Sequence, residues 1–169
     1  MRLTIALVAT LVALASAASG QGAQNGATFR DWTIACRAAA VGQTDCVLSQ
    51  VLVKAETQEL VAEVSLAPAS GTDAEAIVLL LRVPTGVVLP QKPEFAVLDQ
   101  GVEAEMDWLT CDDRYCTAAR TLDGATLSGL RRGATARLGY RRMGTDTPAI
   151  FDISLLGVTA GLAALRPEE

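Results

Sequence analysis

The chain contains no histidine, and aromatic residues make up only 4% of it. Histidine is the usual proton shuttle at neutral pH, the base of most hydrolase triads and a common zinc ligand, so its absence argues against these chemistries. The few aromatic side chains also argue against a sugar-binding platform, which needs exposed rings. The sequence therefore favours a function without histidine-based catalysis or a zinc centre.

Lysine is scarce as well: the chain has Lys54 and Lys92, and neither lies in an S-x-x-K pattern of the kind that activates a serine. The formal net charge is −5, and it would be −6 without residues 1–17, because Arg2 is the only charged residue before Ala18. An acidic chain gains no counterion-release affinity for nucleic acid and no attraction to an anionic membrane surface. We therefore expect no nucleic-acid partner, and no motif indicates a cofactor or a metal ion.

The first residues have the order of a secretory signal. Arg2 is followed by the uncharged apolar run 5–14 and then by the small residues Ala15-Ser16-Ala17. The run is too short to span about 30 Å of hydrocarbon comfortably, so we expect no transmembrane anchor. The sequence predicts a signal peptide over 1–17, with cleavage after Ala18 as the alternative, and export to the periplasm. Attachment to the cell surface and release from the cell are alternative destinations.

The remaining chain has the length of one domain. We expect a flexible leader over 18–28, a single domain over 29–165 and a tail over 166–169. Short apolar or alternating runs separated by glycine, proline and polar turns predict strands at 30–36, 45–53, 60–66, 76–83, 95–98, 103–111, 116–122, 134–142 and 149–156. The run 76–83 is apolar on both faces and predicts a central strand. The fold class is therefore all-β, a sandwich or barrel-like fold of about ten short strands, and 157–165 could form a short C-terminal helix.

The four cysteines form two close pairs, Cys36 with Cys46 and Cys111 with Cys116. In an exported chain they are expected to form disulfides. Four cysteines allow three pairings, and the sequence does not determine which of them forms. Adjacent pairing is favoured, because each pair flanks a short polar connection between strand-like runs. It would close loops of about 11 and 6 residues, worth roughly 2.8 and 2.2 kcal/mol by the loop-entropy estimate.

Two other uses of the cysteines are disfavoured. A reactive thiol needs a lowered pKa, but Asp112 and Asp113 place negative charge beside Cys111, and the spacing is not C-x-x-C. A zinc site needs free thiolates in tight pairs, which export opposes.

Acidic residues offer the remaining route to catalysis. Glu103, Glu105 and Asp107 alternate along one predicted strand, while Asp112 and Asp113 lie inside the second cysteine pair. Two suitably spaced carboxylates can hydrolyse a glycosidic bond. The plainer interpretation is a solvated strand face and a turn. No D-x-D-x-D-G loop indicates a calcium site.

Two adjacent pairs of arginines suggest a basic patch in this acidic chain: Arg131 with Arg132, and Arg141 with Arg142. If 133–140 paired back on 127–132, they would share an edge and could dock an anionic partner. The plainer interpretation is an ordinary surface. Trp32 and Trp108 each precede a cysteine, and we expect both to pack in the core beside the predicted disulfides.

Four short motifs follow one another in a recognisable order. They are Asp31-Trp32 before Cys36 and Cys46, LRVPTGVVL at 81–89, the pair Cys111 and Cys116, and ISLLGV at 153–158. This order resembles that of the invasion-associated locus B family of exported bacterial proteins, over residues 29–165. The interval 112–115 departs from the family pattern, which is usually shorter and contains glycine.

The resemblance implies a periplasmic or envelope-exposed protein with no established enzymatic mechanism. The family takes its name from host-cell invasion by one pathogenic lineage, although similar proteins also occur in free-living bacteria. We expect a non-catalytic protein that binds another protein or an envelope component. The alternative is a small carboxylate-dependent hydrolase of cell-wall glycans. The sequence identifies neither the partner nor the oligomeric state.

Overall fold

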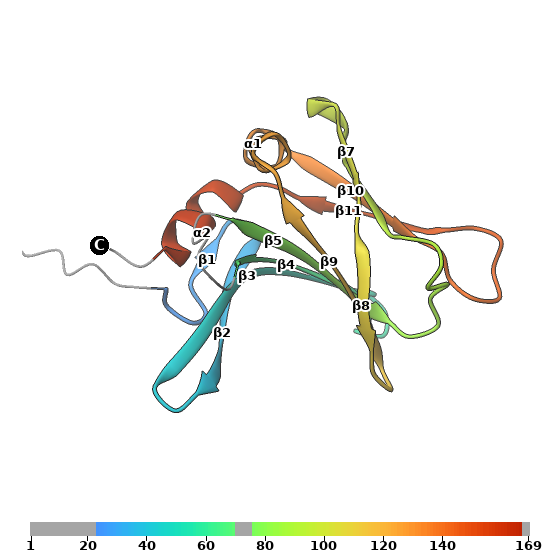
Figure 1. Cartoon of the computed structure of the whole chain (residues 1–169), viewed down its shortest axis with the longest axis horizontal. Coiled ribbons are helices and arrows are strands. Elements are labelled where there is room, and N and C mark those ends of the chain that lie inside the picture. Colours follow the sequence, from blue (N-terminus) through green and yellow to red (C-terminus); the bar gives the residue numbers. More distant parts are fainter. Residues whose placement is uncertain (1–22, 70–75, 167–169) are drawn as a thin grey trace, which may run out of the picture.

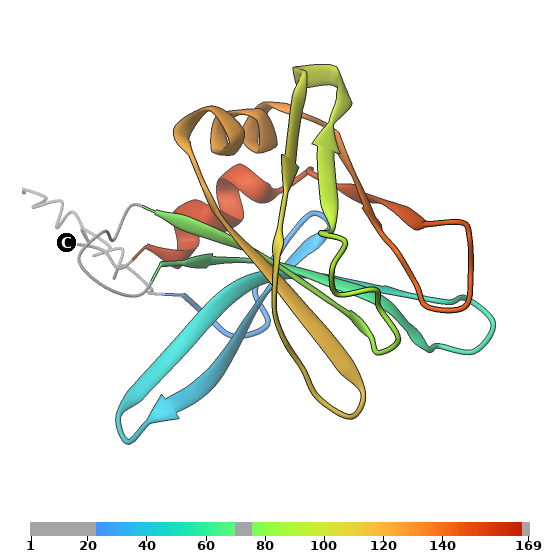
Figure 2. The same cartoon turned by 45° about the vertical axis from the view of Figure 1, so that its right-hand side comes forward.

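The computed structural model describes residues 23–69 and 76–166. The predicted signal peptide and the first residues of the predicted leader lie outside this part of the chain. Within it, eleven antiparallel strands form two sheets, together with two α-helices and one 3₁₀ turn. Figures 1 and 2 show the smaller sheet and both helices on the same side of the larger sheet. The predicted β-rich, disulfide-stapled fold with a short C-terminal helix is confirmed.

The larger sheet contains seven of the described strands in the order β1-β2-β3-β4-β5-β9-β8. Their bounds are β1 (Thr28–Phe29), β2 (Trp32–Ala40), β3 (Gln43–Val53), β4 (Leu60–Pro68), β5 (Ile77–Pro84), β8 (Asp107–Cys111) and β9 (Tyr115–Leu122). β5 lies between β4 and β9, so its predicted interior position in the sheet is confirmed.

The smaller sheet contains four described strands in the order β11-β10-β6-β7. Their bounds are β6 (Glu94–Val97), β7 (Val102–Glu105), β10 (Thr135–Tyr140) and β11 (Ala149–Ser154). The other elements are the 3₁₀ turn η1 (Leu98–Gln100) and the helices α1 (Gly124–Arg132) and α2 (Val158–Leu165). No helix among the described residues is long and apolar enough to cross a membrane.

The core lies between the two sheets. In β5, alternate residues are buried, namely Ile77, Leu79, Leu81 and Val83. The intervening Val78 and Leu80 are half-buried, because the helices and the smaller sheet lie on the other side (Figure 2). A strand that is apolar on both faces therefore has one face in the core and one face without a covering layer.

The described part of the predicted leader lies along β2. The Cys36 N–H donates to the Asn25 side chain at 2.8 Å, and the Gly26 N–H donates to the Ile34 carbonyl at 2.8 Å. Residues 25–29 therefore cover the edge of β2 as far as the first cysteine.

The predicted strand over 103–111 is divided into two strands at Met106. This side chain is fully buried, and its N–H donates to the Pro93 carbonyl at 2.8 Å rather than to a neighbouring strand. The chain passes at this residue from the smaller sheet into the larger one. The break depends on packing between the sheets, so alternation along the sequence did not reveal it.

The helix α1 rules out the pairing of 133–140 with 127–132 that the sequence left open. Asp123 caps the helix by accepting a hydrogen bond from the Thr126 N–H at 2.7 Å, and this bond lowers the pKa of the Asp123 carboxyl. Thr126 and Leu130, four residues apart, bury one face of the helix. The capping signal was present in the sequence, but nine residues are too few for a clear helical pattern.

The cysteines form the two adjacent pairs. Cys36 lies opposite Cys46 in the β2–β3 ladder, and Cys111 lies opposite Cys116 in the β8–β9 ladder. Beyond the first disulfide, the hairpin arm from Arg37 to Asp45 is exposed at every residue and projects from the sheet (Figure 1). An isolated hairpin is only marginally stable in water, so this disulfide stabilises the base of the arm.

Removal of each disulfide should lower the free energy of unfolding by a predictable amount. We expect a loss of about 2.8 kcal/mol for Cys36→Ala/Cys46→Ala and about 2.2 kcal/mol for Cys111→Ala/Cys116→Ala, because the unfolded chain regains loop entropy. The two hairpins lie at opposite sides of the larger sheet, so the losses should add. Urea unfolding of both double variants and of their combination measures this, and unchanged midpoints would contradict it.

Candidate functional site

The outer face of the smaller sheet carries two regular rows of side chains. Strand register places one row across β11, β10, β6 and β7 as Asp152, Arg137, Ala96 and Glu103. The second row consists of Ile150, Gly139, Glu94 and Glu105. The middle of each row thus holds at least one very small residue.

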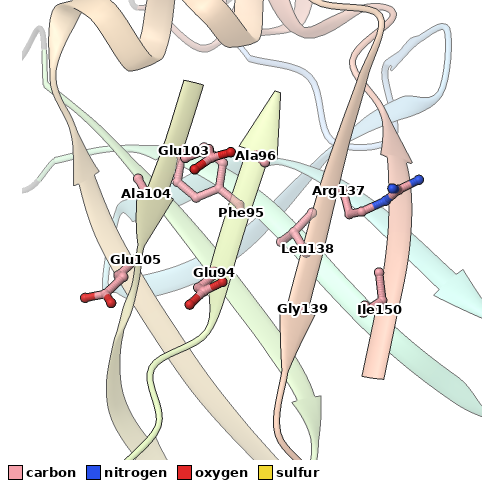
Figure 3. A pocket seen from close by; sticks show the side chains of 10 residues that line it. All are labelled: Glu94, Phe95, Ala96, Glu103, Ala104, Glu105, Arg137, Leu138, Gly139 and Ile150. Carbon is pink, nitrogen blue, oxygen red and sulfur yellow. The ribbon is translucent and has the colours of Figure 1, made fainter. Parts of the chain in front are cut away.

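Ala96 and Gly139 leave room for a hollow of about 480 Å³ on this face. Figure 3 shows the three glutamates of β6 and β7 on one side of it, and Arg137 and Ile150 on the other. A second hollow of about 650 Å³ shares Glu94, Glu105, Gly139 and Ile150 with the first, and is also lined by Arg141 and Pro148. We call the two together the small-sheet groove.

Arg137, Lys92 and Arg141 are the positive residues that line the groove, and Arg137 is neutralised by an ion pair. Arg137 and Asp152 lie opposite each other and form a bidentate pair, with Nε to Oδ1 at 2.8 Å and Nη2 to Oδ2 at 3.0 Å. The hydrogen bond from Arg137 lowers the pKa of the Asp152 carboxyl, and the same contact raises the pKa of Arg137. Arg137 therefore contributes little net charge to the groove.

The three glutamates have few ion-pair partners. Glu94 and Glu105 lie directly opposite each other in the β6–β7 ladder, and Glu103 is on the same face of β7. Lys92 Nζ lies 3.9 Å from Glu105 but 2.7 Å from Asp107, and its hydrogen bond to Asp107 raises the pKa of Lys92. Neither Glu94 nor Glu103 has an ion-pair partner among the described residues. Opposed like charges destabilise a sheet, so this arrangement is unfavourable without a partner.

The structure brings Glu103, Glu105 and Asp107 together and places Asp112 and Asp113 in a separate turn. Glu103 and Glu105 line the small-sheet groove, and Asp107 pairs with Lys92 at the start of β8. Asp112 lies in the β8–β9 turn, where it accepts hydrogen bonds from the Arg114 and Tyr115 N–H groups at 2.8 and 2.7 Å. These bonds lower the pKa of the Asp112 carboxyl, so this residue shapes a turn.

The four predicted arginines do not form one patch. Arg131 and Arg132 end α1, while Arg141 and Arg142 follow β10, whose six residues separate the pairs by about 20 Å. The four arginines do not share a sheet edge, because 127–132 belongs to a helix and does not pair with 133–140. Arg132 donates to Gln100 and Ser128, and Arg141, which borders the groove, donates to the Asp146 carbonyl. An anion-docking role for these residues stays a prediction.

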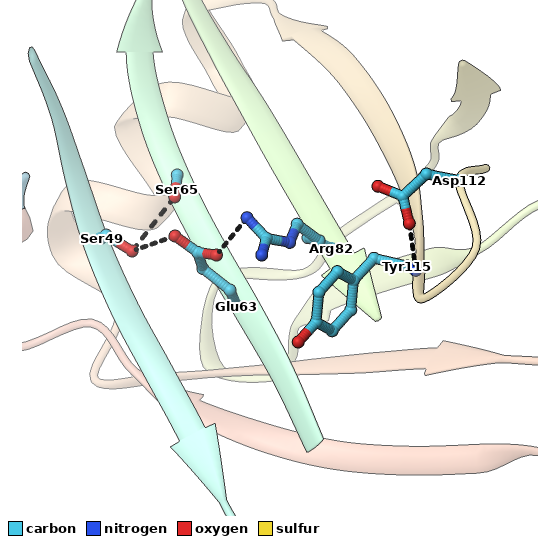
Figure 4. Close-up of polar contacts among 6 residues, drawn as sticks. All are labelled: Ser49, Glu63, Ser65, Arg82, Asp112 and Tyr115. Atoms are coloured by element: carbon cyan, nitrogen blue, oxygen red, sulfur yellow. Dashed lines mark hydrogen bonds and ion pairs between the residues drawn. The ribbon is translucent and has the colours of Figure 1, made fainter. Parts of the chain in front are cut away.

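A second polar arrangement lies on the outer face of the larger sheet (Figure 4). The Ser65 hydroxyl donates to the Ser49 hydroxyl, and Ser49 donates to Glu63, each at 3.2 Å. Arg82 pairs with Glu63 at 3.2 Å and stacks over the Tyr115 ring at 4.4 Å. Ser49 and Ser65 are each only 6% exposed. The charges of Glu63 and Arg82 pair with each other, although the buried Arg82 Nε has no hydrogen-bond partner among the described residues. This chain of contacts stabilises the uncovered face and offers no unpaired charge to a ligand.

The sequence contains the groove residues but does not show that they belong together. The sequence does not indicate Glu94, Ala96 and Gly139 as site residues, because none of them lies in a motif. Alternation in 94–97 and 135–140 indicates which side chains share a face. Their grouping requires the strand order β11-β10-β6-β7, which joins segments far apart in the chain.

Comparison with known proteins places the chain in a family. The family model described as invasion associated locus B (IalB) protein matches residues 32–166. The chain belongs to the IalB family. The resemblance seen in the order of the sequence motifs is thereby confirmed.

A solved IalB structure has the same fold. The crystal structure of invasion associated protein B from Bartonella henselae superimposes with a TM-score of 0.70 at 20% sequence identity, covering 82% of this chain and 92% of the other. No curated protein matches the chain significantly. At 20% identity the likeness establishes the fold of this chain. It does not identify what the chain binds.

The first and the last of the IalB sequence motifs meet where the two sheets join. The Trp32 Nε1–H donates to the Ser154 carbonyl at 2.9 Å, across 122 positions of sequence. In the closing motif, the Leu155 N–H continues the β10–β11 ladder by donating to the Ala134 carbonyl at 2.9 Å. Gly157 then turns the chain into α2 with a φ of 102°. These motif residues therefore account for the fold and lie apart from the groove.

Proposed function

We propose that this IalB family member is a non-catalytic envelope protein that binds a lysine- or arginine-rich segment of a partner protein in the small-sheet groove. The observation that carries the proposal is the set of Glu94, Glu103 and Glu105 around the hollow over Ala96 and Gly139. A cationic segment would relieve the repulsion between the opposed carboxylates. An extended segment would also fit a groove that continues past Pro148.

The cellular location in this proposal is the periplasm, with the cell surface as the alternative. Both disulfides are formed as adjacent pairs, which is typical of chains in an oxidising compartment. The signal predicted over 1–17 would direct the chain there.

The hydrolase alternative is less well supported by the same geometry. A glycosidase acid keeps its proton near neutral pH through an apolar, desolvated setting. Glu94, Glu103 and Glu105 are all exposed on an open sheet face. The groove is therefore better suited to attracting charge than to donating a proton.

Neutralising the glutamates should weaken the binding of a cationic probe. We expect Glu94→Gln/Glu103→Gln/Glu105→Gln to bind a lysine-rich decapeptide roughly tenfold more weakly than the original chain, because each exposed ion pair contributes about 0.5 kcal/mol. Fluorescence anisotropy at low and physiological salt measures the dissociation constants. Salt should weaken binding to the original chain more than binding to the variant.

The matched control removes the same charge elsewhere. Asp31→Asn/Glu56→Gln/Asp113→Asn changes three exposed carboxylates outside the groove and should leave the affinity nearly unchanged. An equal loss of affinity for the decapeptide in both variants would mean that overall net charge causes the effect. It would overturn the assignment to the groove. Release of glycan fragments from cell-wall material, abolished by Glu103→Gln or Glu105→Gln, would replace the proposal with the hydrolase.

A further inference from the structure

The strand β11 has an open edge whose backbone groups can be identified. The Leu155 N–H donates to the Ala134 carbonyl, so residues 155, 153, 151 and 149 direct their hydrogen-bonding groups toward β10. Residues 154, 152 and 150 must then direct theirs away from β10. Ser154 agrees, because its N–H donates to Gln50 and its carbonyl accepts from Trp32 and Gln50.

Only a short stretch of this edge is available. The outward N–H and carbonyl groups of Ile150 and Asp152 have no partner among the described residues. At one end Pro148 has no N–H to offer, and at the other end Ser154 is already bonded. A long strand from another protein could therefore pair with only these two residues, because the residues on either side of them cannot form further bonds.

From this pattern we propose that two copies of the chain pair through β11 about a twofold axis at Phe151. In this register Ile150 of each copy lies opposite Asp152 of the other, and the two pairs exchange four backbone hydrogen bonds. Every open group of the edge is then satisfied. The result is one continuous eight-stranded sheet made from two four-stranded sheets, and it does not depend on what the small-sheet groove binds.

The side chains are compatible with this register. Phe151, which is half-buried on the inner face, would meet its symmetry mate in a non-hydrogen-bonded pair, where cross-strand side chains lie closest. On the outer face Ile150 is 58% exposed and would be covered by the neighbouring strand. Asp152 approaches its mate diagonally, but its bidentate pair with Arg137 neutralises the charge.

Removing the outward donor tests the pairing. Ile150→Pro deletes the outward N–H but leaves the inward bonds of β11 to β10 in place, whereas Ile150→Thr keeps the N–H. The proline variant loses two of the four bonds between copies, so we expect its dimer Kd to rise about thirtyfold relative to the threonine variant, or about 2 kcal/mol. Sedimentation equilibrium at concentrations up to about 0.5 mM measures this, because a weak dimer forms by mass action. Equal thermal stability of the two variants in dilute solution shows that the proline leaves the monomer folded.

Cross-linking tests the position of the axis. Under oxidising conditions Phe151→Cys should form a disulfide-linked dimer, because the paired Cα atoms would be about 4.5 Å apart. Ile150→Cys, whose copies lie off the axis, should cross-link several times more slowly. A chain that stays monomeric across the concentration range would overturn the proposal, as would a dimer insensitive to Ile150→Pro or equal cross-linking at both positions.

Discussion

Replacing Gly157 by alanine should lower the free energy of unfolding by about 3 kcal/mol or more. Gly157 precedes α2 with a φ of 102°, a left-handed conformation that costs other residues about 1–2 kcal/mol. A Cβ atom at this position would also overlap the Phe29 carbonyl oxygen and lie 2.6 Å from the Phe29 carbonyl carbon. The contact is with backbone, so no side chain can rotate away, and forcing it should add about 1–3 kcal/mol. Thermal unfolding should show a Tm lower by about 10 °C.

Gly144 provides the matched control for this substitution. It has a φ of 73°, but a Cβ there would meet no atom within 4 Å. Gly144→Ala should therefore cost only the conformational term of about 1–2 kcal/mol. If both substitutions lowered the Tm equally, the close approach of Phe29 to Gly157 would not be the cause.

The contact between Gly157 and Phe29 shows how the N-terminal and C-terminal segments of the domain pack against each other. The Asp31 N–H donates to the Leu156 carbonyl at 3.5 Å, and α2 packs against β1, β2 and β3. Within α2, a Cβ at Gly161 would overlap the side chain of Leu48, so glycine also sets the distance from the helix to β3. Two glycines in the closing segment thus permit close packing that a larger residue would prevent.

The elements that the sequence predicted correctly are those fixed by local patterns. The apolar run that forms β5 and the small-residue helix α2 each carry their signal within ten residues or so. Met106 and α1 were missed for the opposite reason. The break at Met106 depends on which sheet buries the side chain, and α1 depends on a cap and on contact between Gly129 and Val102.

The candidate site was less predictable than the fold, because it is made by register. Glu103 and Glu105 were singled out from alternation, yet their neighbour Glu94 comes from another strand. The groove floor depends on Gly139 lying opposite Glu94, and the open edge of β11 depends on which residues face β10. A one-residue shift in either ladder would move these side chains to the other face of the sheet.

Replacing Trp32 by alanine should cost about 3–5 kcal/mol, the usual range for deleting a large buried aromatic side chain. Trp32 is 1% exposed in the core at the start of β2, and its Nε1–H donates to the Ser154 carbonyl at 2.9 Å. The substitution therefore removes both core volume and a bond between the two sheets. Trp32→Phe should cost less, about 1–2 kcal/mol, because the Ser154 carbonyl keeps its hydrogen bond from Gln50.

Trp108 is the natural comparison, since it also lies close to a disulfide and donates its Nε1–H to a carbonyl, that of Gln91 at 3.0 Å. It is only half-buried, and it contacts Tyr140 edge-on with ring centroids 6.3 Å apart. Trp108→Ala should therefore cost about 1–2 kcal/mol, because less apolar area leaves the core. Urea unfolding of Trp32→Ala and Trp108→Ala decides between them. Equal losses would contradict the dependence on burial, and a loss in Trp32→Phe as large as that in Trp32→Ala would assign the effect to the hydrogen bond between the two sheets.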